Sequence, residues 1–261
     1  NDASTVFDLV ILGGGSGGYA AALRGAQLGL DVALIEKNKL GGTCLHNGCI
    51  PTKALLHAGE VADQSRESEQ FGIKTSFEGV DMAGVHKYKD EVIAGLYKGL
   101  QGLVASRKIT YIEGAGRLSS PTSVDVNGQR VEGRHVLLAT GSVPKTLPGL
   151  EIDGNRIISS DHALTLDRVP KSAIVLGGGV IGVEFASAWK SFGTEVTVIE
   201  GLKHLVPVED ENSSKLLERA FRKRGIKFNL GTFFQKAEYT QDGVKVTLAD
   251  GKEFEAEVLL V

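Results

Sequence analysis

Residues 8–18 have the sequence DLVILGGGSGG, in which a short apolar run passes directly into a cluster of glycines. Such a run is typical of a strand that is buried in a parallel sheet. The alanine-rich residues 20–23 then favour a helix, and a second apolar run, residues 31–35, ends in Glu36. Residues 8–36 therefore predict the strand–turn–helix–strand unit of a Rossmann-like dinucleotide-binding fold.

The same unit occurs a second time, 164 positions further along the chain. Its three glycines and its acidic residue, first Gly13, Gly15, Gly18 and Glu36, are repeated as Gly177, Gly179, Gly182 and Glu200. The glycines permit a tight turn, a close backbone approach to a pyrophosphate and the packing of helix on strand. The acidic residue accepts hydrogen bonds from the adenosine ribose. Two copies predict two dinucleotide sites; the alternative is a pair of turns that only permit tight packing.

Glu200 also bears on which nicotinamide cofactor the second site would take. A carboxylate at this place repels the 2′-phosphate of NADP, so the sequence favours NAD. Lys203 and His204 lie nearby in the chain and weaken this preference slightly.

The composition is that of an ordinary globular protein. Of 261 residues, 42% are hydrophobic and 23% are charged, which excludes a disordered tail, a fibre and a disulfide-dense mini-protein. The net charge is −3, and no apolar run reaches the ~20 residues that span a bilayer, so we expect neither a nucleic-acid nor a membrane partner. The start, Asn1-Asp2-Ala3, lacks the basic flank of a signal peptide, and we expect a cytoplasmic protein.

Cys44 and Cys49 are the only cysteines, and three interpretations of them compete. A metal site would need a second Cys or His pair at suitable spacing, so we expect no metal. A structural disulfide would close a loop of only six residues and would stabilise little. A redox pair fits their position directly after the first glycine unit, and this interpretation is favoured.

The spacing of the two cysteines constrains the backbone between them. Positions i and i+5 of a regular helix lie about 8 to 9 Å apart, whereas a disulfide needs Cα atoms within about 7 Å. A bond between Cys44 and Cys49 therefore needs a break in the helix, and Asn47-Gly48 supplies flexible backbone for it. Pro51 suits the opening of a regular helix that continues from Thr52 to about Arg66.

The segment Gly41-Gly42-Thr43-Cys44 through Cys49-Ile50-Pro51-Thr52-Lys53 resembles the active-site segment of the flavin-dependent pyridine-nucleotide disulfide oxidoreductases. Within that family, Ala54-Leu55-Leu56-His57 is most similar to the dihydrolipoamide dehydrogenase branch. The segment Ala139-Thr140-Gly141-Ser142 and the second glycine unit support the resemblance. It spans essentially the whole sequence but only about the first half of the family's chain.

The resemblance implies roles for individual residues. FAD would be bound by the first glycine unit and the segments around it: Gly13, Gly15, Gly18, Glu36, Lys37, Gly42, Thr43, Lys53, Gly116, Thr140, Gly141 and Ser142. NAD would be bound by the second unit: Gly177, Gly179, Gly182 and Glu200. Cys44 would exchange with the substrate and Cys49 would face the flavin, with Lys53 nearby and paired with Glu184.

The resemblance also implies a reaction. Two electrons would pass from dihydrolipoyl groups through Cys44–Cys49 and FAD to NAD⁺. The substrate would be a dihydrolipoyl-lysine on an acyltransferase or carrier protein of a 2-oxo acid dehydrogenase complex, and the full-length chain would form a homodimer. Three alternatives stay open: a glutathione reductase, against which Glu200 argues; a mercuric reductase; and a nucleotide-binding module without catalysis.

The sequence predicts an α/β fold of two Rossmann-like domains with β-meanders, without the family's C-terminal dimerisation domain. Residues 1–146 would form an incomplete FAD-binding domain and residues 147–261 a truncated NAD-binding domain, so we expect weak FAD binding and no turnover from this chain alone. A further helix is expected over residues 90–107, with hairpin turns at Asn127-Gly128, Asp242-Gly243 and Asp250-Gly251. His46 stands where the family often has Asn; of two interpretations, a group that lowers a thiol pKa and a partly exposed loop residue, the second is favoured.

Overall fold

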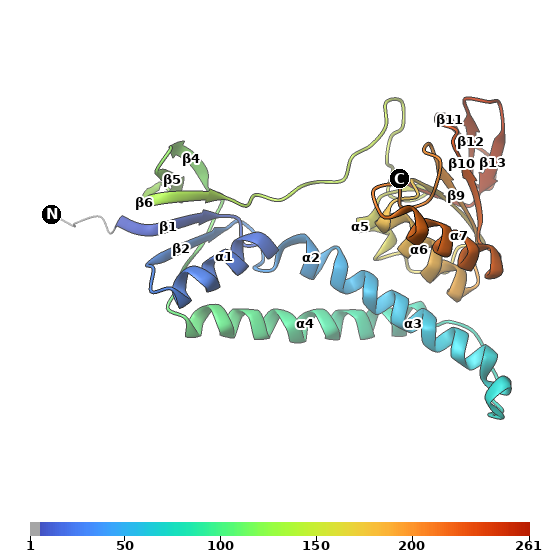
Figure 1. Ribbon diagram of the computed structural model, residues 1–261, viewed down its shortest axis with the longest axis horizontal. Helices are drawn as coiled ribbons and strands as arrows, with labels where there is room; N and C mark the ends of the chain where they lie inside the picture. Colours follow the sequence, from blue (N-terminus) through green and yellow to red (C-terminus); the bar gives the residue numbers. More distant parts are fainter. Residues whose placement is uncertain (1–5) are drawn as a thin grey trace. The chain divides into compact units, whose positions relative to one another are not determined.

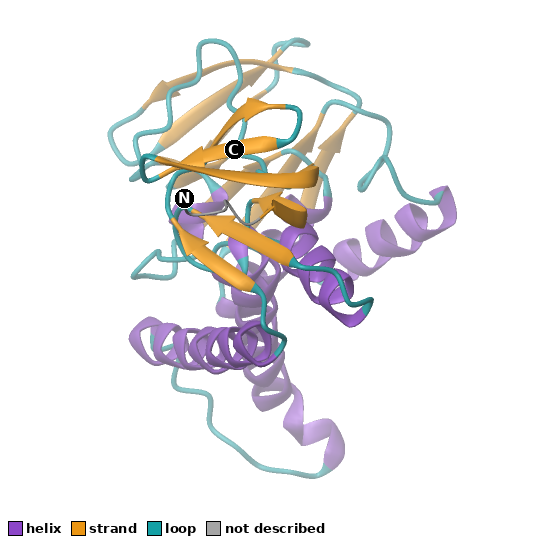
Figure 2. Ribbon diagram, turned by 90° about the vertical axis from the view of Figure 1, so that its left-hand side faces the viewer, coloured by secondary structure: helices purple, strands orange, loops and turns teal. Residues whose placement is uncertain are grey.

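The computed structural model describes residues 6–261, which form two compact units (Figures 1 and 2). The first unit runs to Pro51 and resumes over Asp90–Val143; the second comprises Thr52–Lys89 and Pro144–Val261. The expectation about Asn1-Asp2-Ala3 falls outside the described residues.

The first unit is built on a six-stranded sheet of order β3-β2-β1-β6-β5-β4. Its strands are β1 (Val6–Leu12), β2 (Val32–Glu36), β3 (Thr110–Glu113), β4 (Arg117–Ser120), β5 (Ser123–Val126) and β6 (Gln129–Leu138). β1 pairs in parallel with β2 and β6, while β4, β5 and β6 form an antiparallel meander. The helices are α1 (Ser16–Gln27), α2 (Gly42–His46), the start of α3 (Cys49–Glu67) and the greater part of α4 (Met82–Ser106).

The second unit repeats the parallel architecture and adds a separate antiparallel sheet. Its parallel sheet has the order β10-β9-β8-β14-β7. The strands are β7 (Ile157–Ile158), β8 (Ser172–Leu176), β9 (Glu195–Glu200), β10 (Lys227–Leu230) and β14 (Val258–Leu260). The antiparallel sheet consists of β11 (Phe234–Tyr239), β12 (Val244–Leu248) and β13 (Glu253–Ala256). The helices are most of α3, the short η1 (Ser68–Phe71), the start of α4, α5 (Ser160–Ala163), α6 (Val180–Phe192) and α7 (Glu211–Lys223).

The predicted hairpin turns are confirmed. Asn127 and Gly128 both have positive φ, 53° and 76°, and join β5 to β6, as a tight turn between antiparallel strands requires. The turns at Asp242-Gly243 and Asp250-Gly251 join β11 to β12 and β12 to β13. The α/β class with its parallel sheets is therefore established, with the meanders where the sequence placed them.

Residues 52–89 differ from the expectation in two ways. The helix expected from residue 90 begins at Met82, because Asp81 caps it: its Oδ1 accepts a hydrogen bond from the N–H of Ala83 at 3.0 Å. The whole stretch also packs in the second unit, where Leu55 and Met82 share an apolar core with Trp189. Trp189 is only 2% exposed, so it is a packing residue of this core.

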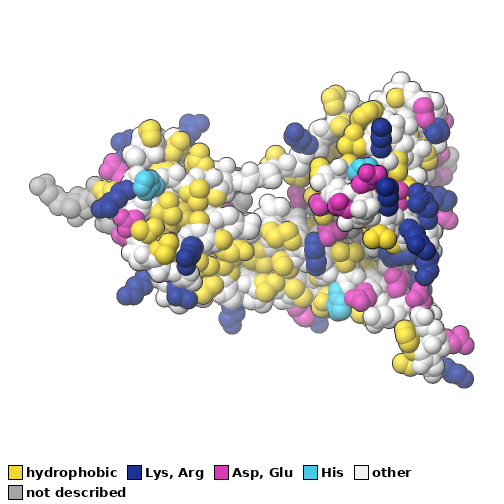
Figure 3. Space-filling model, viewed as in Figure 1, with side chains coloured by type: hydrophobic (Ala, Val, Ile, Leu, Met, Phe, Trp, Pro, Cys, Tyr) yellow, Lys and Arg dark blue, Asp and Glu magenta, His cyan; other side chains and the backbone are white. Residues whose placement is uncertain are grey.

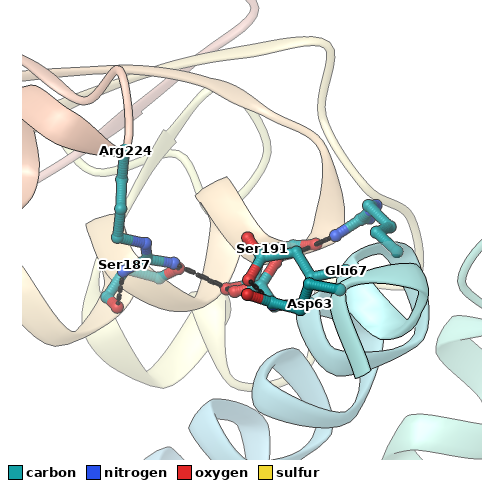
Figure 4. A network of polar contacts seen from close by, with 7 residues as sticks. Asp63, Glu67, Ser187, Ser191 and Arg224 are labelled. Carbon is teal, nitrogen blue, oxygen red and sulfur yellow. Dashed lines mark hydrogen bonds and ion pairs between the residues drawn. The ribbon is translucent and has the colours of Figure 1, made fainter. Parts of the chain in front are cut away.

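A polar network fastens α3 to α6 inside the second unit (Figure 4). Ser191 on α6 donates a hydrogen bond of 2.6 Å to the carboxylate of Asp63 on α3. Arg224, just after α7, donates to the hydroxyl of Ser191 at 2.7 Å and to that of Ser187 at 2.6 Å. Arg66 reaches both Asp63, at 3.0 Å, and the carbonyl of Ser191, at 2.6 Å. Asp63 is thus the common acceptor of a network that joins three helices.

Replacing Asp63 by alanine is expected to lower the free energy of unfolding of the second unit by about 2 kcal/mol, because charge-assisted donors lose their acceptor. Urea unfolding followed by the fluorescence of the single tryptophan, Trp189, measures this. Lys236→Ala is the control, since it breaks an exposed ion pair with Glu238 and should change little. Equal losses in the two variants would contradict the role of the network.

Candidate functional site

The glycine turn of the first unit has the geometry that only glycine can adopt. Gly13 has φ +109°, and its N–H donates to the carbonyl of Ile35 at 2.8 Å. A Cβ on Gly18 would overlap the carbonyl oxygen of Gly13, so the helix can approach the turn only without a side chain there. Gly15 is the N-cap of α1, with extended backbone. The three glycines therefore bring the N-terminus of α1 directly behind the end of β1.

Glu36 closes the same turn from the end of β2. Its carboxylate accepts hydrogen bonds from the N–H of Gly14 at 2.7 Å and of Asn38 at 2.8 Å. Burial raises the pKa of the nearby Tyr111 above its usual value, and the charges of Glu113, Tyr97 and Glu36 add to the effect. The Tyr111 phenol therefore stays neutral, and the fixed carboxylate of Glu36 supplies acceptor oxygens at this edge of the sheet.

The second unit reproduces this turn bond for bond. Gly177 has φ +116° and donates to Ile199 at 2.8 Å, and a Cβ on Gly182 would overlap the oxygen of Gly177. The carboxylate of Glu200 accepts from the N–H of Gly178 at 2.7 Å and of Leu202 at 2.8 Å. The repeat that the sequence spacing predicted is thus also a repeat of hydrogen bonds.

Both turns fit the pyrophosphate of a dinucleotide. Neither α1 nor α6 has a side-chain cap or an acidic residue in its first turn, so their first N–H groups and the positive end of each helix dipole face outward without competition. Such a helix N-terminus is the usual site for a phosphate group. The residues present in each unit therefore suit the adenine half of a dinucleotide.

The two turns differ in what lies beside them. Both turns accept a hydrogen bond from the loop after their second strand, Gly14 from the N–H of Gly41 at 2.8 Å and Gly178 from that of Val206 at 2.7 Å. In the first unit a Cβ on Gly42 would also come within 2.6 Å of the Cα of Gly15. In the second unit nothing lies within 4 Å of a Cβ built on Gly179. The helix that carries Cys44 therefore begins directly against the first turn.

Cys44 and Cys49 form a disulfide within the first unit. Their Cα atoms are 4.7 Å apart, much closer than one continuous helix would allow, because α2 ends at His46 and α3 begins at Cys49. The expected break at Asn47-Gly48 is confirmed. Cys49 is exposed and Cys44 half-buried, so the bond is open to a dithiol from outside.

Lys53 and Glu184 meet within the second unit. Lys53 follows Cys49 by four residues on α3, and its Nζ lies 2.6 Å from the carboxylate of Glu184 near the start of α6. Their side chains are 57% and 21% exposed. Residues 131 positions apart are thus paired as the resemblance implied, while their part in chemistry stays a prediction.

The remaining predicted residues lie around the first turn. Lys37 is the residue directly after β2, and Thr43 lies on α2; both are exposed. Gly116 is packed so that a Cβ would lie 2.6 Å from Leu12. Thr140-Gly141-Ser142 leaves the end of β6, where the carbonyl of Ala139 covers Gly13. All of them are near the turn, and their contacts with a cofactor stay predictions.

The sequence missed the contacts of His46. Its Nε2 lies 2.9 Å from the carbonyl oxygen of Leu40, and its ring meets the ring of Tyr97 edge-on at 5.1 Å between centroids. Tyr97 is 51 residues further along the chain, on α4, so no local pattern could reveal the pair. His46 is half-buried between two partners, and the interpretation as a plain loop residue leaves these contacts out.

No group of three or more His, Cys, Asp or Glu side chains within residues 6–261 is arranged to hold a metal ion. None of the helices described there is long and apolar enough to cross a membrane.

The family described as "Pyridine nucleotide-disulphide oxidoreductase" matches residues 7–261. The chain belongs to this family. Among curated relatives, the mitochondrial dihydrolipoyl dehydrogenase of Pisum sativum is 42% identical over 97% of this chain and 53% of its own length. The dihydrolipoyl dehydrogenase of Bacillus subtilis is 44% identical over 87% of this chain and 51% of its own. The leghemoglobin reductase of Vigna unguiculata is 42% identical over 97% and 51%.

Solved structures of this disulfide oxidoreductase family agree with the fold. LpdA from Mycobacterium tuberculosis superimposes with a TM-score of 0.86 at 29% identity, covering 97% of this chain and 57% of LpdA. The flavoprotein disulfide reductase RclA from Escherichia coli superimposes with a TM-score of 0.79, also at 29% identity, covering 97% and 55%. The chain spans about half the length of the relatives it matches.

Proposed function

We propose that this chain carries the FAD- and NAD-binding parts of a dihydrolipoyl dehydrogenase, in residues 1–146 and 147–261. The observation that supports this most is the start of the Cys44 helix directly against the first glycine turn, where Gly42 and Gly15 nearly touch. Dihydrolipoyl dehydrogenases use FAD and NAD. FAD would bind at the glycine turn of Gly13, and NAD would bind at the glycine turn of Gly177. The disulfide would therefore lie next to the FAD-binding site.

The residues of the chain can carry out the thiol chemistry themselves. One sulfur of a dihydrolipoyl group attacks Cys44, the Cys44–Cys49 bond breaks, and Cys49 leaves as a thiolate. The second sulfur of the substrate then attacks the mixed disulfide, releases Cys44 and closes the lipoyl ring. Two electrons now reside on the two cysteines. When bound, FAD would accept this electron pair and deliver it to NAD⁺.

Lys53 and Glu184 would set the charge near this dithiol. Lys53 is one helical turn beyond Cys49, so its ammonium favours the Cys49 thiolate as the bond opens. Glu184 holds the ammonium by the 2.6 Å contact and so limits its freedom. The pair would orient charge rather than transfer a proton.

Dihydrolipoamide under nitrogen is expected to open the disulfide and release two thiols per chain. Alkylation followed by mass measurement counts them, and oxidised lipoamide is the control reagent that should release none. The released lipoamide should equal one per chain, since the electrons must balance. A chain that keeps its disulfide under excess dihydrolipoamide would overturn the proposal.

The second unit is expected to bind NADH about tenfold more tightly than NADPH, because Glu200 repels the 2′-phosphate; this corresponds to about 1.4 kcal/mol. Calorimetric titration measures both affinities. Glu200→Gln should narrow the preference, while Glu195→Gln, at the opposite end of β9, should leave it unchanged. Equal affinities for the two cofactors in the unaltered chain would refute the argument from Glu200.

Partners and location follow from the same proposal. The dihydrolipoyl group would be carried on a lysine of an acyltransferase or carrier protein of a 2-oxo acid dehydrogenase complex, and the full-length protein would be a homodimer. A cytoplasmic location stays a prediction, since the relative from Pisum sativum is mitochondrial. Figure 3 shows apolar side chains on the surface of the first unit. Leu137 and Leu138, at the end of β6, are exposed apolar residues of this unit. An exposed apolar surface of this kind is typical of a surface that contacts another molecule.

A further inference from the structure

We propose that His46 is a positioning residue for thiol–disulfide exchange, which holds the turn between Cys44 and Cys49 in its closed geometry. The inference rests on the proposed function only for the identity of the dithiol substrate. It concerns residues that all lie in the first unit, and it assigns a role to a side chain that stands between the two cysteines.

The first contact of His46 is a hydrogen bond to the loop that enters its own helix. A carbonyl oxygen can only accept, so Nε2 of His46 carries the proton and donates to Leu40 across 2.9 Å. Leu40 is buried, 2% exposed, and therefore offers a fixed acceptor. Gly41, with φ +109°, and Gly42 then lead from Leu40 into α2. The imidazole thus joins the last residue of α2 to the loop before its first.

The second contact fixes the imidazole from another helix. The rings of His46 and Tyr97 meet at an interplanar angle of 76° with centroids 5.1 Å apart, a favourable edge-on arrangement. Tyr97 lies on α4, which packs through Leu100 and Val104 into the same apolar core as Leu40. His46 is therefore held by a long helix as well as by the entry loop, and the turn to Cys49 starts from a residue that both contacts hold in place.

These contacts bear on the redox equilibrium because α2 has only five residues and no side-chain cap at its N-terminus. A helix of this length is not stable by itself. In the disulfide form, the Cys44–Cys49 bond helps to hold it; in the dithiol form, that constraint is gone. Contacts made in the closed geometry and loosened in the open form stabilise the disulfide relative to the dithiol. His46 would then set how readily an external dithiol opens the bond.

The reaction that reports this equilibrium is simple exchange with dithiothreitol, without any cofactor. The two thiols of the reagent become its cyclic disulfide, and the Cys44–Cys49 bond becomes two thiols, so two electrons and two protons pass to the chain. His46→Ala is expected to shift the equilibrium constant about tenfold toward the dithiol, since a hydrogen bond and a ring contact are lost. Tyr97→Leu keeps an apolar side chain, loses only the ring contact, and should shift it about threefold in the same direction.

The matched control is His57→Ala on α3, whose histidine is exposed and paired with Glu60 rather than with the redox turn. It should leave the equilibrium constant unchanged. Urea unfolding of each oxidised variant separates the two possible effects, since a residue that stabilises both redox forms equally lowers stability without moving the constant. If His46→Ala does not fold, the equilibrium constant of Tyr97→Leu with dithiothreitol is the test of the inference.

An unchanged constant in both His46→Ala and Tyr97→Leu would overturn the inference, and so would a shift toward the disulfide. The outcome is independent of the proposed function. A wild-type bond that dithiothreitol opens but dihydrolipoamide does not would contradict the proposed substrate and leave the role of His46 standing.

Discussion

A Gly18→Ala variant is expected to lose FAD binding at least about a hundredfold while it still binds NAD⁺, and Gly182→Ala is expected to show the reverse. The added methyl group would overlap the carbonyl oxygen of Gly13 in one case and of Gly177 in the other. Backbone oxygens cannot rotate away as a side chain can, so the helix must move off the turn. Its N–H groups then no longer converge on the pyrophosphate.

The two variants are controls for each other. Flavin fluorescence reports FAD binding and calorimetry reports NAD⁺ binding on the same preparation, so a generally misfolded chain would lose both. Gly17→Ala is the matched control, because nothing lies within 4 Å of a Cβ built there and the corresponding position of the second unit is Ile181. If Gly18→Ala lost only NAD⁺ binding, the assignment of the two cofactors to the two units would be wrong.

Removing either cysteine is expected to abolish the conversion of dihydrolipoamide to lipoamide with little loss of stability. Each variant keeps one cysteine, which is a free thiol, so the chain has no disulfide for dihydrolipoamide to attack and nothing that can accept its two electrons. The disulfide closes a loop of only six residues, which the chain-entropy estimate values at about 2 kcal/mol. Lipoamide formation should therefore be lost completely in both variants, while the chain remains folded.

Chromatographic measurement of lipoamide formed per chain tests Cys44→Ser and Cys49→Ser. Asn47→Ser, on an exposed residue between them, should retain one equivalent. Urea unfolding of the same samples reports stability. Lipoamide formation by either cysteine variant at the wild-type level would show that the electrons take another route.

The repeated glycine units could be predicted because their requirements are local. Strand β8 has the same bounds, Ser172–Leu176, as the apolar run in the sequence, and the acidic residues 36 and 200 end their strands as the spacing indicates. A tight turn that needs a positive φ requires glycine, and a buried strand requires a run of apolar residues, so both can be recognised in the sequence. These signals depend on neighbours a few residues away.

The packing of residues 52–89 could not be predicted in the same way. Its helices show only ordinary amphipathic patterns, which indicate that a face is buried but not against which sheet. The contacts that decide it join Asp63 to Ser191, 128 positions away, and Lys53 to Glu184, 131 positions away. The contacts of His46 could not be predicted for a related reason. Its ring partner, Tyr97, lies on α4, and nothing in the sequence around the two cysteines shows which face of that helix they meet.

Because the two glycine turns match so closely, neither can distinguish FAD from NAD⁺ by contacts with the adenosine diphosphate moiety. FAD and NAD⁺ share that moiety, and each turn offers it the same N–H groups and a carboxylate held in the same way. Discrimination between FAD and NAD⁺ would then come from what lies beside each turn, as the helix of Cys44 lies beside the first, and from the other half of each molecule, isoalloxazine or nicotinamide. Free ADP would accordingly compete at both places, and a drug built on adenine alone would have no basis for selectivity.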